Sequence, residues 1–286
     1  MEGWTPRTSR VPLPRDHILP RTTPYEWFTQ CIQRGVGTMP HDGRNDPMEA
    51  DSMTSVQIPG PVDEVIRRMR AIKDELDPRD GVASFNNMYL RVTELVGEQL
   101  TAGFFADSAF IERLDVIFAQ LYFDAVDADK RGNQPNEVWR PVFDSRSNRT
   151  VWPLQFALAG MNAHINHDLA LAVVKTCKER GTTPDTKPVH ADYLKVNELL
   201  ARIEAQVRAE YEPALLKLAS KDAEALKHIL SSFSIARARD AAWVTTQVLW
   251  MQRDNKQLFG MTLRTLEQSV ATAGRMLLTP VVPMPR

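Results

Sequence analysis

The sequence predicts an all-α protein, and three observations lead to that prediction. Apolar residues recur at the i, i+3, i+4, i+7 spacing of helices, and no run alternates apolar and polar residues as strands do. The chain has 13 glycines, about 5% against a usual share of roughly 7%, so few tight hairpin turns are expected. Its 19 prolines gather near the ends and at a few junctions, which leaves long stretches free for helices. We therefore expect a single-domain multi-helix bundle with a central buried helix.

Composition and charge exclude several classes of protein. The 35 Lys and Arg residues balance 36 Asp and Glu residues, so the net charge is −1 and the basic excess needed for nucleic acid or an anionic membrane is missing. No apolar run approaches the roughly 20 residues that span a bilayer, and the first residues lack the apolar core of a signal peptide. Cys31 and Cys177 lie far apart, which argues against a disulfide scaffold or a cysteine zinc site. We expect a cytoplasmic protein that acts on a small molecule, with no nucleic-acid or membrane partner, and that could form a homodimer.

The chain divides into three regions. Frequent prolines and charges over residues 1–57 predict a loosely ordered, irregular N-terminal arm, in which residues 25–34 could form one short helix. Residues 58–280 carry the helical periodicity and are expected to form one domain. The proline-rich residues 281–286 cannot continue a helix and are expected to form a tail.

Boundaries of the helices follow from capping residues and prolines. Pro61 suits the first position of a helix, Asp107 can cap another, and Gly181 is a suitable residue just after a helix end. Residues 130–150 are polar and interrupted by prolines, so we expect a loop there, anchored by Trp139. The expected helices, in order, cover residues 61–76, 82–100, 107–129, 152–180, 190–209, 213–219, 223–253 and 258–278.

The helix expected over residues 152–180 differs from the others because it is apolar on all sides. Such a helix is normally buried in the core. Its middle nevertheless carries five polar side chains within seven residues, and burying each of them unpaired would cost a few kcal/mol. Each should therefore find a partner in another side chain, a water, a metal or a ligand. The five are Asn162, His164, Asn166, His167 and Asp168.

Helix geometry separates these five side chains into two groups. At about 100° per residue, His164, His167 and Asp168 share one sector about 100° wide, whereas Asn162 and Asn166 lie about 40° apart in another. Two imidazoles and a carboxylate are ligand types of Zn²⁺, Mn²⁺ or non-haem Fe²⁺. They also suit acid–base catalysis by a histidine that a carboxylate orients. A purely structural hydrogen-bond network is the alternative.

Carboxylates on the helix of residues 107–129 could complete such a site. Asp124 shares the apolar face of Ile117 and Leu121, and Asp115 shares a face with Phe118. A carboxylate on an apolar face is expected to be buried or nearly so, where it would be a metal ligand or the partner of an arginine.

Residues 232–243 form a second unusual stretch, rich in alanine. Arg237 and Asp240 are i, i+3 neighbours that can pair, and Arg239 shares a face with Trp243. A buried arginine there could neutralise a core carboxylate or bind an anionic group of a substrate through two hydrogen bonds. A structural ion pair between helices is the alternative.

Five runs of sequence carry a family resemblance: FNNMYLRVTE, FFADSAFIERLDVIFAQLYFDAVDA, PLQFALAGMNAHINHDLALAV, PVHADYLKVNELLA and SIARARDAAWV. They resemble DUF5995, an all-helical family with no assigned function that is common in actinobacteria. The resemblance covers about residues 60–280. It implies a shared fold and suggests that these polar segments form one site, but it assigns no roles.

Two better-known helical classes share less with the chain. Zinc-dependent phospholipase C enzymes carry HxxxD on a core helix, as His164 and Asp168 do, but the HxxxE helix is missing here and Trp4 follows an unprocessed start. Class I terpene cyclases need DDxxD and a second metal motif, and neither is present. A non-canonical cyclase that binds a diphosphate through Asp124 and Arg237 or Arg239 is an architectural alternative.

The sequence thus favours a helical enzyme that performs a hydrolase or lyase/cyclase type tailoring step, of the kind found in secondary metabolism, on a largely apolar small molecule. A non-catalytic binding or interaction protein with a structural polar core is the alternative. A divalent metal (Zn, Mn, Fe or Mg) could bind, and otherwise no cofactor is expected. The catalytic candidates are His164, His167, Asp168 and Asp240. The metal candidates are His164, His167, Asp168 and Asp124. The substrate-binding candidates are Arg237, Arg239, Tyr122, Trp243 and Asn162.

Overall fold

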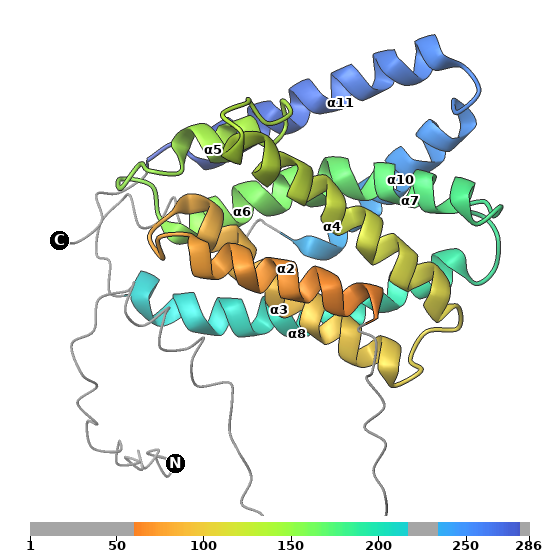
Figure 1. Ribbon diagram of the computed structural model, residues 1–286, viewed down its shortest axis with the longest axis horizontal. Coiled ribbons are helices and arrows are strands. Elements are labelled where there is room, and N and C mark those ends of the chain that lie inside the picture. Colours follow the sequence, from red (N-terminus) through yellow and green to blue (C-terminus); the bar gives the residue numbers. More distant parts are fainter. Residues whose placement is uncertain (1–59, 217–233, 281–286) are drawn as a thin grey trace, which may run out of the picture. The chain divides into compact units, whose positions relative to one another are not determined.

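The structure, a computed structural model, describes residues 60–216 and 234–280 (Figure 1). The arm expected over residues 1–57, with its short helix, lies outside the described residues, as does the tail 281–286. Backbone contacts divide the chain into residues 1–48 and 49–286, and every described residue belongs to the second unit. All regular elements within the described ranges are helices, which confirms the predicted all-α class.

The helices begin and end close to the predicted residues. Pro61 occupies the first turn of its helix, and the Asp107 carboxylate accepts a hydrogen bond from the Phe110 backbone N–H at 2.9 Å, so both predicted starts are confirmed. Gly181 adopts a φ of +62°, the left-handed conformation of a residue just after a helix end. The elements are α2 (Pro61–Glu75), α3 (Gly81–Thr101), α4 (Ser108–Lys130), α5 (Arg140–Ser145), α6 (Pro153–Ala163), η1 (His164–Asp168), α7 (Leu169–Glu179), α8 (Val189–Leu216), α10 (Ile235–Met251) and α11 (Lys256–Leu277).

Three predicted boundaries are wrong. The expected loop 130–150 contains α5, a short helix that follows the fully buried anchor Trp139. The helix expected to end at residue 209 continues to Leu216, so the first residues of the separate helix expected at 213–219 belong to α8. Ser234 has an extended backbone and caps α10, so no single helix covers 223–253, although residues 217–233 themselves lie outside the described ranges.

One helix lies at the centre of the fold, as predicted. The elements α6, η1 and α7 follow one another without a break in helical backbone and together contact α3, α4, α10 and α11. Residues 154–165 are all buried. The close approach of α3 depends on Gly160, where a Cβ atom would lie 2.4 Å from the Phe85 ring. A glycine at this point lets α3 pack directly against the polar segment of the central helix.

The remaining helices enclose this centre. α2 packs on α3 and α4, α8 contacts α3, α4 and α10, and α11 lies along α6 on the other side of the central helix from α2 (Figure 1). Within the described ranges, the helices are too short or too polar to cross a bilayer.

Candidate active site

The predicted histidine–aspartate cluster assembles around the carboxylate of Asp168, which is fully buried. Oδ2 of Asp168 lies 3.0 Å from His164 Nδ1 and accepts a hydrogen bond from the Trp139 indole N–H at 2.9 Å, while Oδ1 lies 2.7 Å from His167 Nδ1. The five residues from His164 to Asp168 form a π-helical turn, in which the Leu169 N–H bonds to the His164 carbonyl oxygen. Single π turns of this kind inside α-helices are frequent at functional sites.

The hydrogen bonds fix the protonation of the cluster. Burial alone would raise the pKa of Asp168, but the hydrogen bonds from His164 and His167 outweigh it and hold the pKa below its ordinary value. An ionised carboxylate only accepts hydrogen bonds, so Nδ1 of each histidine carries the hydrogen. Burial lowers the pKa of His164 despite the neighbouring carboxylate. At neutral pH, His164 is therefore a neutral imidazole whose lone pair is on Nε2.

Aromatic rings hold the His164 imidazole in place. The ring is stacked on Phe118, with centroids 3.5 Å apart and planes at 9°, and Tyr89 packs edge-on at 4.4 Å. Nε2 of His164 is buried and has no hydrogen-bond partner within the described part of the chain. A buried polar atom left unpaired in this way is a candidate contact for a ligand.

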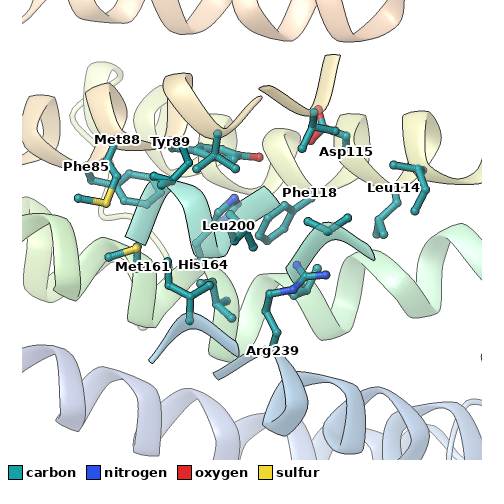
Figure 2. A pocket seen from close by; sticks show the side chains of 18 residues that line it. Phe85, Met88, Tyr89, Leu114, Asp115, Phe118, Met161, His164, Leu200 and Arg239 are labelled. Atoms are coloured by element: carbon teal, nitrogen blue, oxygen red, sulfur yellow. The ribbon is translucent and has the colours of Figure 1, made fainter. Parts of the chain in front are cut away.

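His164 also forms part of the wall of a cavity of about 80 Å³ between α3, α4, the central helix, α8 and α10 (Figure 2). One buried water needs roughly 10–15 Å³ of such space, so this cavity admits a small molecule. Its wall is mostly apolar, and the polar side chains in it are Tyr89, Asp115, His164 and Arg239. The apolar lining consists of Phe85, Met88, Val92, Val96, Ile111, Leu114, Phe118, Met161, Ile165, Leu169, Val196, Leu200, Ile203 and Ile235.

Asp115 brings a second titratable group to this cavity from α4. Its side chain is 9% exposed, and Oδ2 has no hydrogen-bond partner among the described residues. Burial without a compensating charge raises the pKa of Asp115 to about 7. Near neutral pH a large fraction of Asp115 is thus a protonated carboxylic acid that can donate a hydrogen bond.

Arg239 enters the cavity from α10, on a different wall from Asp115 (Figure 2). Its side chain is 5% exposed, and burial lowers its pKa. Nε donates to the Asn197 side-chain oxygen at 2.5 Å, Nη2 donates to the Tyr193 carbonyl at 2.8 Å, and the guanidinium lies 4.1 Å from the centre of the Tyr193 ring. The cavity wall therefore contains a base, an acid and a cation.

Comparison with known proteins connects this core to a family. The model of a family of unknown function, DUF5995, matches residues 62–280, a range that runs from α2 to just beyond α11. The chain belongs to the DUF5995 family. The comparison with curated proteins finds no match, and neither does the comparison with solved structures. The DUF5995 region includes every residue of the cavity wall.

Three of the predicted site residues lie on the surface of this DUF5995 fold. Asp124 is exposed on α4 and accepts a hydrogen bond from the Gln120 side chain at 2.7 Å, so its expected burial is wrong. Arg237 and Asp240 are exposed on α10, and within the described residues they form no ion pair with each other. The cavity lies on the other side of that helix, where Arg239 points. The diphosphate site proposed for a cyclase-like enzyme is therefore not assembled, because Asp124 and Arg237 lie outside the cavity.

Three further candidates are buried but do not line the cavity. The Tyr122 hydroxyl donates to the Asn86 side-chain oxygen at 3.2 Å, and Trp243 stacks on His190 at 4.2 Å. Asn162 donates to the Val270 carbonyl at 2.9 Å, and its own oxygen accepts from Asn166. The polar groups of Tyr122 and Asn162 are thus occupied within the protein, and Trp243 packs its ring on His190 away from the cavity wall, so the substrate-binding role predicted for the three gains no support.

The predicted metal ligands do not converge either. His167 uses Nδ1 for Asp168, and its Nε2 lies 3.8 Å from a Glu267 oxygen on α11, away from the cavity wall. In the described ranges, no three His, Cys, Asp or Glu side chains are placed so that they could share a metal ion. The predicted four-residue metal site is therefore not assembled. The two histidines form hydrogen bonds to Asp168, and Asp124 is exposed on α4.

Asp115 lines the cavity although the sequence pattern does not distinguish it as a site residue. Its position on the face of Ile111 and Phe118 was the available signal, and both of those residues line the cavity with it. Trp139 was expected as an anchor, and its additional role as a hydrogen-bond donor to Asp168 had no sequence signal.

Proposed function

We propose that this protein is an enzyme that transfers a proton to or from a small, largely apolar molecule, with His164 as the general base. One observation carries the proposal. One nitrogen of the imidazole is hydrogen-bonded to an ionised, buried carboxylate, the other has no partner among the described residues, and the residue lines an apolar cavity. A carboxylate that holds a histidine in one tautomer, with the second nitrogen free toward the substrate, is the arrangement that general base catalysis requires.

Asp115 is proposed as the matching general acid. Burial raises the pKa of Asp115, whereas burial lowers the pKa of His164. When the pKa values of two groups in one cavity are shifted in these directions, one group can be a neutral acid and the other a free base at the same pH. A positioned acid or base typically contributes a factor of about 10²–10⁴ to the rate.

An elimination, as in a lyase, is a reaction that a general base and a general acid in one cavity can catalyse together. His164 Nε2 would take a proton from a carbon atom, and the electrons of that C–H bond would form the new double bond. The leaving group would depart with the proton of Asp115. The apolar wall would exclude water, which strengthens both interactions.

The proposal is tested with 5-nitrobenzisoxazole, a small planar compound whose ring opens to a coloured phenolate when a base removes its C3 proton. We expect the purified protein to accelerate this reaction and His164→Gln to reduce the acceleration by about 10²-fold or more. Asp168→Asn should reduce it too, because the imidazole loses its orienting partner. His190→Gln is the matched control, since His190 is an exposed histidine on α8 that does not line the cavity. Equal rates for His164→Gln and His190→Gln would refute the assignment.

A second measurement does not depend on a substrate. Nitrogen-15 NMR of the histidine side chains should show His164 as the Nδ1–H tautomer near pH 7. A His164 that carries its hydrogen on Nε2, or that is doubly protonated, could not act as the base.

The alternative, a binding protein without catalysis, is favoured by a different observation. Asp168 accepts hydrogen bonds from Trp139 as well as from both histidines, so the cluster ties the segment before α5 to the central helix. If this structural role is the whole role, His164→Gln will lower the melting temperature and leave the rate of the 5-nitrobenzisoxazole reaction unchanged.

A further inference from the structure

Arg239 is a buried cation whose guanidinium contacts no acidic side chain among the described residues, and Asp240, its neighbour in the chain, acts on it only from beyond contact distance. Its side chain is 5% exposed, and no Asp or Glu oxygen in the described ranges lies within 4.0 Å of its guanidinium. The groups that it does contact are neutral: the Asn197 side-chain oxygen, the Tyr193 carbonyl and the Tyr193 ring. Buried charges in proteins are normally paired, because the interior solvates an isolated charge poorly.

The unpaired charge faces the cavity. Nε and Nη2 are used by Asn197 and Tyr193, whereas Nη1 makes no hydrogen bond with the described residues. Since Arg239 lines the cavity, an anionic group bound there could accept a hydrogen bond from Nη1 and compensate the positive charge. The two neutral acceptors also hold the guanidinium in one orientation, which reduces the entropy lost when an anion binds.

The surroundings of Arg239 restrict the type of anion. Among the described residues that line the cavity, Arg239 is the one Lys or Arg side chain, so this part of the wall compensates a single negative charge. Three apolar residues line the cavity with it: Ile235, one turn earlier on α10, and Val196 and Leu200 on α8. One charge beside an apolar wall suits a carboxylate on an apolar body better than a phosphate, which carries more charge and usually meets several donors.

We infer that the cavity binds an amphipathic monocarboxylate, with its carboxylate on Arg239 and its apolar body along the wall toward His164. This inference rests on the proposed function in one respect only, because it takes the same cavity as the substrate site. It does not require His164 to be a base. The pairing with Arg239 would also fix the carboxylate at one end of the cavity and leave the apolar body of the substrate for the acid and the base to act on.

Calorimetric titration with a matched pair of probes tests the inference. Hexanoate and hexan-1-ol have the same apolar chain and differ in charge. We expect wild-type protein to bind hexanoate about tenfold or more tightly than hexan-1-ol, as one charge-assisted pair in an apolar site allows. Arg239→Gln should lose that preference and bind both probes alike. Arg237→Gln, two residues away on the exposed face of α10, should keep it.

Other outcomes overturn the inference. Equal affinity of the wild-type protein for the two probes, or a preference for hexanoate that survives in Arg239→Gln, would exclude Arg239 as the anion site, and so would binding of neither probe. If Arg239→Gln does not fold, the wild-type comparison still decides whether a charge is recognised, and Arg239→Lys, which keeps the charge, should retain part of the preference.

The two proposals fail separately. His164→Gln should bind hexanoate as the wild type does. If it does so while the 5-nitrobenzisoxazole reaction is independent of His164, the acid–base function is wrong and the carboxylate site stands. If the reaction depends on His164 but hexanoate shows no dependence on Arg239, the carboxylate site is wrong and the base stands.

Discussion

Asp115 shows how a single residue couples the cavity to pH. Its carboxyl group is buried with Oδ2 unpartnered, and burial raises its pKa from 3.8 to about 7. Between roughly pH 4 and pH 7 the folded protein therefore keeps a proton that the unfolded chain has lost. The free energy of unfolding falls as the pH rises through this window, by at most on the order of 4 kcal/mol. This contribution to stability is present in full below the unfolded pKa and is lost above the folded pKa.

The substitution Asp115→Asn should remove this pH dependence, because the amide has nearly the same shape and does not ionise. Relative to wild type, we expect the variant to melt at a higher temperature near about pH 8 and to show no gain near about pH 5. Thermal unfolding followed by circular dichroism at both pH values provides the measurement. Asp124→Asn is the control on the same helix, because Asp124 is exposed. A difference between Asp115→Asn and wild type that does not change with pH would argue against the raised pKa.

Trp139 contributes to the same core through one hydrogen bond. Its indole N–H donates to Asp168, and its ring, which is fully buried, packs against Phe85 with centroids 5.0 Å apart. Trp139→Phe removes the donor and leaves a smaller aromatic ring, so we expect the free energy of unfolding to fall by about 2–4 kcal/mol. Urea unfolding measures it. Trp250→Phe, at a half-buried tryptophan on α10, should cost clearly less. Equal losses would mean that the bond to Asp168 adds nothing.

At the scale of helices, glycine placement decides how closely α3 and α6 approach. A Cβ atom at Gly160 would lie 2.4 Å from the Phe85 ring, whereas one at Gly97 on α3 would meet Ile66 and Val62 at an ordinary 3.5 Å. Alanine favours a helix over glycine by about 1 kcal/mol at either position. We therefore expect Gly97→Ala to stabilise the protein and Gly160→Ala to destabilise it by about 1–3 kcal/mol, because the clash outweighs the propensity. Chemical denaturation of the two variants measures the change in the free energy of unfolding. A change of the same sign in both variants would contradict the close packing of α3 on α6 at Gly160.

Most helices could be predicted from the sequence because periodicity and capping act locally. Asp107 and Pro61 mark helix starts through contacts within one turn, and the structure has both. The six residues of α5 are too few for an apolar period to show, and its stability depends on the burial of Trp139 and its neighbours by other helices. The π turn at His164–Asp168 leaves no trace in periodicity, because the helix around it is apolar on nearly all sides and has no single stripe whose phase could shift.

The site could be predicted in part, for the same reason. His164, His167 and Asp168 lie within one turn of one helix, so local geometry places them together. Whether the Asp124 side chain is buried depends on which helices cover α4 along its length. Arg113 and Asp107, near the start of α4, pair with residues at the end of α7, whereas Asp127, near its end, pairs with Arg68 of α2. The buried face therefore turns along the helix: near its end, positions 122, 123, 125 and 126 are buried and Asp124 is on the opposite side.

At the scale of the whole described domain, α11 is an outer layer that polar side chains attach to the central helix. Its buried residues all lie in its second half, which faces α6. The Asn162 side chain donates to the Val270 carbonyl, and the Gln155 side chain donates to the Leu277 and Thr279 carbonyls at 2.7 and 2.8 Å. Because α11 buries few residues, these hydrogen bonds are a large share of the interactions that hold α11 against the central helix. Helices attached in this way tend to open locally, without unfolding of the rest.

Gln155→Leu tests whether α11 opens as a separate unit. The substitution replaces the amide with an apolar side chain of similar size, so the Leu277 and Thr279 carbonyls lose their donor and two hydrogen bonds worth about 1–3 kcal/mol together are lost. The Trp152 backbone N–H at the start of α6 also loses its acceptor, the Gln155 side-chain oxygen at 3.2 Å. Native-state hydrogen exchange followed by mass spectrometry should show α11 amides exchanging about tenfold to a hundredfold faster, with α3 and α4 little changed. Gln120→Leu, at an exposed glutamine on α4, should leave every peptide unaffected. A uniform acceleration across all helices would instead mean that α11 and the central helix unfold together, and that the wall around His164 opens only when the whole domain does.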